Sequence, residues 1–124
     1  MISEPCPCGA GPYAGCCGPF HDGGRAPTAE ALMRSRFSAF ARGDTAYLLR
    51  SWHPETRPKR LRLEAGQEWT RLEILGRTGG GLLETEGTVE FRAHYRYQGH
   101  DGVLHENSRF RREGGEWRYL DGIH

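Results

Sequence analysis

All four cysteines of this chain lie within the twelve-residue segment CPCGAGPYAGCC near the amino terminus. Cys6 and Cys8 form one close pair, and the adjacent residues Cys16 and Cys17 form the other. Disulfides in small domains join loops that are distant in sequence, and adjacent cysteines pair poorly because a disulfide needs its two Cα atoms well apart. A zinc ion, in contrast, binds four thiolates in a tetrahedron, and two close pairs on a flexible loop can supply them. The segment therefore predicts a small zinc knuckle with these four cysteines as ligands.

The spacing leaves the fourth ligand and the chemistry of the cluster open. His21 lies four residues after Cys17 and could replace it as a ligand, although we favour the cysteine. A redox-active thiol cluster or a set of free cysteines would also fit these residues. Four protein ligands leave no position for a substrate water, so zinc in this segment is expected to be structural rather than catalytic.

Length and charge exclude several classes of protein. A chain of 124 residues can bury one modest core, and its mean hydropathy of −0.71 fits a polar globular domain. No apolar run approaches the roughly 20 residues of a membrane span, and no signal peptide pattern is visible, so we expect a cytoplasmic protein without membrane contact. The net charge of +1 gives no reason to expect a nucleic acid partner. The basic run at 57–62 is flanked by Glu55 and Glu64 and is expected to be a solvated loop.

Capping and turn residues divide the rest of the chain into helices and strands. Thr28 can cap a helix that ends at Arg42, because Gly43 suits the position just past a helix end. Asp44 can cap a shorter helix through Trp52. Alternating apolar residues predict strands at 69–75, 88–97, 103–111 and 116–121, with a flexible loop at 76–81. Two helices followed by an antiparallel meander predict an α+β fold in which the long helix packs across a curved sheet.

Two parts of the sequence resemble known families. CPCGAGPYAGCCG resembles the SEC-C motif, named for the zinc-binding tail of the SecA translocase, although the seven residues between Cys8 and Cys16 are one fewer than usual. Four later segments are similar to the YchJ-like bacterial proteins: LMRSRFSAFARGD (32–44), SWHPETRP (51–58), HENSRF (105–110) and WRYLDG (117–122).

The resemblance implies a fold and a metal but no reaction. It implies a SEC-C zinc knuckle over residues 1–24 and an NTF2-like (cystatin-like) domain over residues 25–124, with a curved antiparallel sheet packed on N-terminal helices. NTF2-like domains often form a cone with an internal pocket. In the translocase the comparable tail binds proteins, which suggests by analogy a protein partner for the knuckle.

Periodicity places one arginine inside the expected core. At the helical period, Arg36 falls on the same face as Leu32, Phe37 and Phe40, so it should point at the sheet. An unpaired buried charge is costly, so this side chain needs a partner.

Alternation along the last two strands supplies candidate carboxylates. Trp117 and Tyr119 should face the helix, and Asp121 then faces it too. If Phe110 lies opposite Trp117, Glu106 meets Asp121 on this inner face. The sequence therefore predicts that one arginine and two carboxylates lie together beneath the long helix.

We interpret this cluster first as a structural ion-pair network and second as a ligand pocket, with a catalytic site the least favoured. His53 would be the functional histidine at the pocket rim, although a histidine at a helix end more often interacts with the last carbonyls. The candidate pocket residues are Arg36, Trp52, His53, Glu106, Ser108, Tyr119 and Asp121.

The sequence favours a binding role over catalysis. It contains no phosphate-binding loop, dinucleotide fingerprint or nucleophile elbow, so no residue is assigned a catalytic role. The leading hypothesis is a zinc-binding adapter that contacts a protein through its knuckle. The alternative is a small-molecule-binding protein or enzyme that uses the pocket around Arg36, Glu106 and Asp121.

Overall fold

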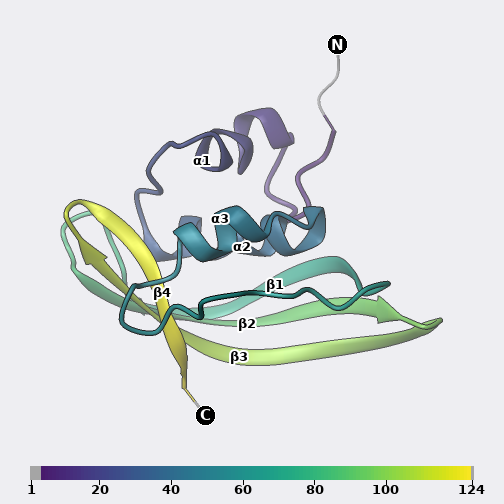
Figure 1. The fold of residues 1–124 in the computed structure, drawn as a ribbon. Coiled ribbons are helices and arrows are strands. Elements are labelled where there is room, and N and C mark those ends of the chain that lie inside the picture. Colours follow the sequence, from purple (N-terminus) through teal and green to yellow (C-terminus); the bar gives the residue numbers. More distant parts are fainter. Residues whose placement is uncertain (1–3, 124) are drawn as a thin grey trace.

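The helices of the protein cover one face of a curved, four-stranded sheet (Figure 1). The computed structural model describes residues 4–123. Its elements are a 3-10 helix η1 (Tyr13–Gly15), the helices α1 (Gly18–His21), α2 (Ala29–Arg42) and α3 (Thr45–Arg50), and the strands β1 (Glu68–Gly79), β2 (Glu86–Tyr97), β3 (His100–Glu113) and β4 (Glu116–Ile123). Neighbouring strands are antiparallel in the order β1-β2-β3-β4, which confirms the predicted α+β fold. Within these residues, no helix has the length and apolar character needed to cross a membrane.

Local caps set the bounds of α2 and α3. Thr28 Oγ1 accepts a hydrogen bond from the Ala31 N–H (3.1 Å) at the start of α2, and Gly43 ends the helix with a φ of +72°. Asp44 Oδ1 accepts a backbone N–H at the start of α3 (3.0 Å). The sequence predicted these caps, but α3 ends at Arg50, before the predicted end of that helix.

β1 extends to Gly79, into the glycine-rich segment 76–81 that the sequence predicted as a flexible loop. Gly79 pairs with Gly87 in the sheet. A Cβ on Gly87 would lie 2.5 Å from the Cα of Gly80, so the two backbones can approach this closely only because Gly87 has no side chain. The Gly80 carbonyl also accepts the N–H of Ala29 (3.0 Å), which joins this corner of the sheet to the start of α2.

β3 and β4 pair in a different register from the one predicted. Phe110 lies opposite Tyr119 rather than Trp117. The register shifts next to Arg109, which leaves Leu120 as an extra residue on β4, as in a β-bulge. Because side chains alternate between the two faces of a strand, one extra residue moves everything after it to the opposite face.

One hydrophobic core joins the cysteine segment, α2 and the sheet. Its buried members include Cys6, Cys8, Cys17, Leu32, Met33, Phe37, Val89, Phe91, Phe110 and Trp117. The cysteine segment thus packs on the same core as the helix and the sheet. The boundary between residues 24 and 25 stays a prediction.

Candidate metal centre and binding cavity

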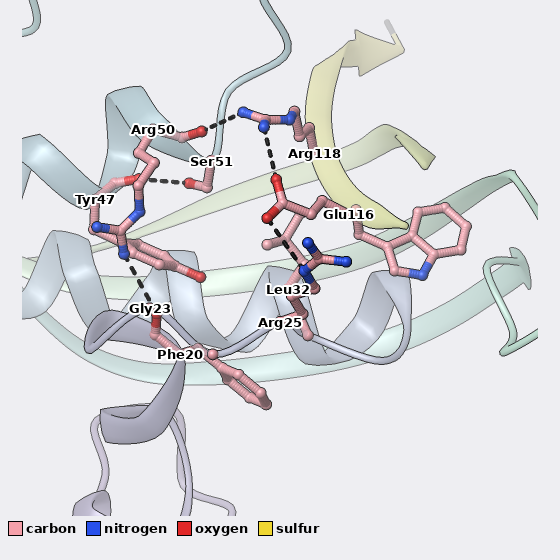
Figure 2. Close-up of a pocket in the computed structure, with 12 residues that line it drawn as sticks. Phe20, Gly23, Arg25, Leu32, Tyr47, Arg50, Ser51, Glu116 and Arg118 are labelled. Atoms are coloured by element: carbon pink, nitrogen blue, oxygen red, sulfur yellow. Dashed lines mark hydrogen bonds and ion pairs between the residues drawn. The ribbon is translucent and has the colours of Figure 1, made fainter. Parts of the chain in front are cut away.

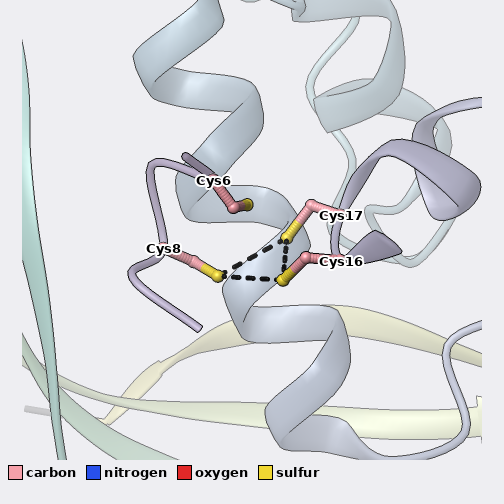
Figure 3. Close-up of side chains that lie close together, drawn as sticks. All are labelled: Cys6, Cys8, Cys16 and Cys17. Atoms are coloured by element: carbon pink, nitrogen blue, oxygen red, sulfur yellow. Dashed lines mark hydrogen bonds between the residues drawn. The ribbon is translucent and has the colours of Figure 1, made fainter. Parts of the chain in front are cut away.

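The four cysteine side chains point toward one another (Figure 3). Their Sγ atoms all lie within 4.8 Å of one another. Cys8 Sγ is 3.4 Å from Cys16 Sγ and 3.8 Å from Cys17 Sγ, and none of the four residues forms a disulfide. Zinc–sulfur bonds of about 2.3 Å in a tetrahedron would hold the sulfurs about 3.8 Å apart. The donor atoms and their spacing therefore fit one tetrahedral metal ion.

Backbone turns bring the two cysteine pairs together. The Gly9 N–H donates to the Cys6 carbonyl (2.9 Å), and the Cys6 N–H donates to the Gly11 carbonyl (2.7 Å). Gly9 has a φ of +84°, which residues with a side chain rarely adopt. Gly18, directly after the second pair, packs so closely that a Cβ would lie 2.8 Å from the carbonyl oxygen of Tyr13. These contacts shape the site through the backbone of the segment itself.

Burial and crowding disfavour several thiolates at this site unless a cation is bound. The hydrogen bond with Cys17 lowers the pKa of Cys8 to about 4, and the same hydrogen bond, together with burial, raises the pKa of Cys17. Burial raises the pKa of Cys16 to about 12, and the neighbouring Cys8 adds to the effect. One thiolate therefore opposes the ionisation of its neighbours, and a dication in place of the protons would relieve this repulsion.

Polar contacts fix the cluster to α2. Cys6 Sγ lies 3.1 Å from Ser38 Oγ, and Arg34 Nη1 donates to the Cys8 carbonyl (3.2 Å). Both partners belong to the middle of α2, so the cysteine cluster is attached to the main helix of the fold.

The imidazole of His21, the other candidate for the fourth ligand, is engaged elsewhere. Its Nε2 lies 2.8 Å from the carbonyl oxygen of Ser35, and its Nδ1 lies 2.5 Å from the hydroxyl of Tyr13. Because a carbonyl only accepts, Nε2 carries the proton and Nδ1 accepts from the tyrosine. Both ring nitrogens therefore have protein partners, which favours Cys17 as the fourth ligand.

A cavity of about 170 Å³ lies between α2 and the sheet. Five of the seven predicted pocket residues line it: Arg36, Trp52, Glu106, Ser108 and Tyr119. The sequence reasoning missed Trp69 on β1, whose ring lies 6.2 Å from that of Phe37 and 6.0 Å from that of Phe40. An aromatic residue at the start of a predicted strand was the signal that could have identified it.

Arg36 is buried against this cavity without the predicted carboxylate partner. Its side chain is 3% exposed, and Nη1 donates to the Leu48 carbonyl (2.8 Å) and to Ser51 Oγ (2.7 Å). The guanidinium carbon lies 4.6 Å from the ring centre of Tyr119 and 5.2 Å from that of Trp52. Burial lowers the pKa of this guanidinium to about 10. Among residues 4–123 no carboxylate lies within salt-bridge distance of Arg36, so the predicted network around it does not form.

The prediction that Asp121 faces the helix is wrong. The bulge on β4 turns its side chain to the opposite face, where it pairs with Arg109 through contacts of 2.6 and 2.5 Å. Glu106, which was expected to meet Asp121, instead accepts a hydrogen bond from Ser108 Oγ (3.0 Å). One predicted carboxylate therefore lines the cavity and the other lies outside it.

His53 is buried but does not line the cavity. Its Nδ1 accepts the Glu55 N–H (3.1 Å), and its Nε2 lies 3.1 Å from a carboxylate oxygen of Glu113. The His53 N–H donates to the carbonyl of Tyr119 (2.7 Å), which holds the residue beside β4. The structure therefore places the imidazole of His53 outside the cavity.

A second cleft opens between the segment after α1, α3 and β4 (Figure 2). Three arginines line it, and each already has partners. Arg118 donates to Glu116 (2.7 Å) and to the Arg50 carbonyl (2.8 Å), and Arg25 also lies 3.5 Å from Glu116. Arg50 donates to the Phe20 carbonyl (3.4 Å). The basic side chains here connect elements of the fold.

Comparison with known families identifies the domain that follows the cysteines. Residues 28–122 match a family described as YchJ, middle NTF2-like domain. This match confirms the predicted fold class.

Relatives and solved structures resemble nearly the whole chain. A UPF0225 protein of Streptomyces coelicolor is 57% identical over 98% of this chain and 97% of its own length. A UPF0225 protein of Corynebacterium glutamicum is 53% identical over 98% of each chain.

Two solved structures share the fold and carry the name of the cysteine motif. A SEC-C motif containing protein from Rhodopseudomonas palustris has a TM-score of 0.82 and 34% identity, and covers 97% of this chain and 98% of its own. One from Psychrobacter arcticus has a TM-score of 0.77 and 29% identity, and covers 98% of this chain and 81% of its own.

Proposed function

The chain belongs to the YchJ-like family of UPF0225 proteins, and from this membership we propose that it is a small-molecule-binding protein stabilised by a structural zinc ion. The observation that carries the binding role is Arg36, a buried cation in the wall of the cavity that has no carboxylate of residues 4–123 within salt-bridge distance. The sequence favoured an adapter that acts through its knuckle. The burial of three of the four cysteines in the common core supports a stabilising role for the knuckle instead.

Four sulfur donors at tetrahedral spacing support zinc as the metal. The ion would be held by Cys6, Cys8, Cys16 and Cys17 and would link the two ends of the segment, which contacts α2 through Ser38 and Arg34. A zinc–thiolate site with reduced cysteines is typical of a reducing compartment, so the proposal includes a cytoplasmic location.

Metal analysis tests the zinc assignment. Protein purified under reducing conditions should contain one zinc per chain by elemental analysis and native mass spectrometry. Cys16→Ser should lose the metal, because three thiolates and a hydroxyl form a much weaker zinc site. Wild-type protein that neither carries zinc nor takes it up on titration would contradict the assignment.

Blocking the cavity tests the binding role. Leu104 lines the cavity and is 45% exposed, so it marks an opening to solvent, whereas its neighbour Val103 is 51% exposed and does not line the cavity. Leu104→Trp should weaken binding of benzyl alcohol, a small neutral probe, by roughly tenfold or more, and Val103→Trp should leave it unchanged. Binding measured by NMR titration that is equal in both variants would place the probe elsewhere and count against the cavity.

A protein-binding role remains a second candidate, favoured by two leucines between β1 and β2. Leu82 is 65% exposed and Leu83 is 94% exposed, and adjacent large apolar side chains in contact with water favour protein contacts. A photoreactive residue at position 83 should then crosslink one reproducible partner in cells, and the same group at Lys59 should not. Crosslinks that are absent or identical at both positions would eliminate this candidate.

A further inference from the structure

We infer that the ligand of the cavity is a small carboxylate with a flat apolar body, and that Arg36 binds its negative charge. This inference rests on the proposed function, since it specifies the chemistry of the same cavity.

Arg36 is a buried cation with unused hydrogen-bonding capacity. Arg36 has five N–H donors, and its hydrogen bonds with residues 4–123 use only Nη1, toward Leu48 and Ser51. Both acceptors are neutral, and Glu106, which acts on the guanidinium at longer range, lies beyond salt-bridge distance, so Arg36 has no directly paired carboxylate among residues 4–123. Buried charges in proteins are usually paired with an opposite charge, and a carboxylate is the group whose geometry fits a guanidinium best.

The size and lining of the cavity fit a small ligand with an apolar body. Its volume of about 170 Å³ is close to that of an apolar cavity of about 150 Å³ known to hold benzene. The rings of Phe37, Phe40, Trp52, Trp69 and Tyr119 form much of the wall. A ligand of one ring, or a short branched chain of the same size, would place its apolar body against these rings.

The position of Arg36 favours an anionic ligand over a cationic one in this cavity. Aromatic cavities often bind cations over the faces of their rings. In this cavity the guanidinium of Arg36 already lies over Tyr119 and Trp52, so a second cation would lie beside a buried positive charge. Glu106 offers no comparable attraction for a cation, because it is only half-buried and its carboxylate accepts the hydroxyl of Ser108.

Three probes of one shape test the inference on the full zinc-loaded chain: benzoate, benzyl alcohol and benzylamine. Their affinities are compared by isothermal titration calorimetry and NMR titration. Benzoate should bind roughly tenfold to hundredfold more tightly than benzyl alcohol, as expected for a charge-assisted hydrogen bond, and benzylamine should bind most weakly. Arg36→Met should remove the preference for benzoate. Glu106→Gln, which leaves the arginine in place, should strengthen benzoate binding and is the second variant if Arg36→Met does not fold.

The outcomes separate the inference from the proposed function. If benzyl alcohol or benzylamine binds as tightly as benzoate, and Leu104→Trp blocks it, the cavity binds ligands but the preference for carboxylates is wrong. If Glu106→Gln weakens benzoate binding, the assignment of the charge to Arg36 is wrong as well. If none of the three probes binds at millimolar concentration, both the inference and the cavity function fail.

Discussion

At the scale of single residues, the surroundings of a charge determine its role in this protein. Helical periodicity placed Arg36 in the core, where two carboxylates were expected beside it. Arg109 lies on the open face of the sheet and pairs with Asp121, where water screens the interaction. Arg36 lies in the core and relies on a carbonyl, a hydroxyl and two aromatic rings. Only the second arrangement leaves a charge that a ligand could neutralise.

The surface pair leads to a prediction about Asp121. Asp121→Asn should leave the midpoint of thermal unfolding within a few degrees of the wild-type value, because exposed ion pairs contribute little to stability. Phe110→Ala, one residue away from the pair on β3, is the contrasting variant and should cost about 3–5 kcal/mol. Similar losses in the two variants, measured by thermal and urea unfolding, would mean that Asp121 belongs to a buried network after all.

The contacts of His21 lead to a prediction about the fourth metal ligand. His21→Ala should keep one zinc per chain and lose about 1–2 kcal/mol of stability, because it removes one hydrogen bond to α2 and one to Tyr13 within the knuckle. Cys17→Ser should lose the zinc. Elemental analysis of both variants decides the question, and the reverse result would make the histidine the ligand.

At the scale of helices and strands, local signals were predictable and pairing between strands was not. The caps at Thr28 and Gly43 depend on residues within one turn, so the bounds of α2 follow from the sequence. The bulge at Leu120 does not, because Tyr119 and Leu120 are adjacent apolar residues and either could face the helix. The error in register is the reason that Asp121 was assigned to the wrong face.

In the candidate site, too, local features could be predicted and contacts between distant elements could not. The four cysteines could be predicted because all the donors lie in one short segment with its own turns. The burial of Arg36 followed from helical periodicity, but its partners did not. They are the Leu48 carbonyl and the Ser51 hydroxyl, which reach it only through the packing of α2 against the end of α3.

The end of α2 provides a prediction at this scale. Gly43→Ala should reduce the free energy of unfolding by about 1 kcal/mol, because the residue has a φ of +72° and a Cβ there meets no other atom within 4 Å. The cost is thus purely conformational. Gly76→Ala is the matched control, since that position also has free space but no positive φ. Urea unfolding should show the loss only at position 43.

At the scale of the whole molecule, the cysteine segment and the sheet stabilise α2 from opposite sides. The buried cysteines contact the same helix that covers β2, and that helix also forms one wall of the cavity. Arg34 and Ser38 contact the cysteine cluster, and Arg36 lies between them in sequence and faces the cavity. A change at the metal centre should therefore be transmitted to α2 before it reaches the strands.

Removal of the metal tests whether α2 is affected before the strands. A zinc chelator under reducing conditions should lower the unfolding temperature, because metal-binding energy is lost from the folded state only. Hydrogen exchange followed by mass spectrometry should then show faster exchange in residues 4–24 and in α2, while β2 and β3 keep their protection. The paired central strands are held by their own ladder of hydrogen bonds and do not contact the cysteine segment through the backbone. Uniform loss of protection would mean that the metal supports the entire fold, and unchanged exchange in α2 would mean that the knuckle is independent of the domain.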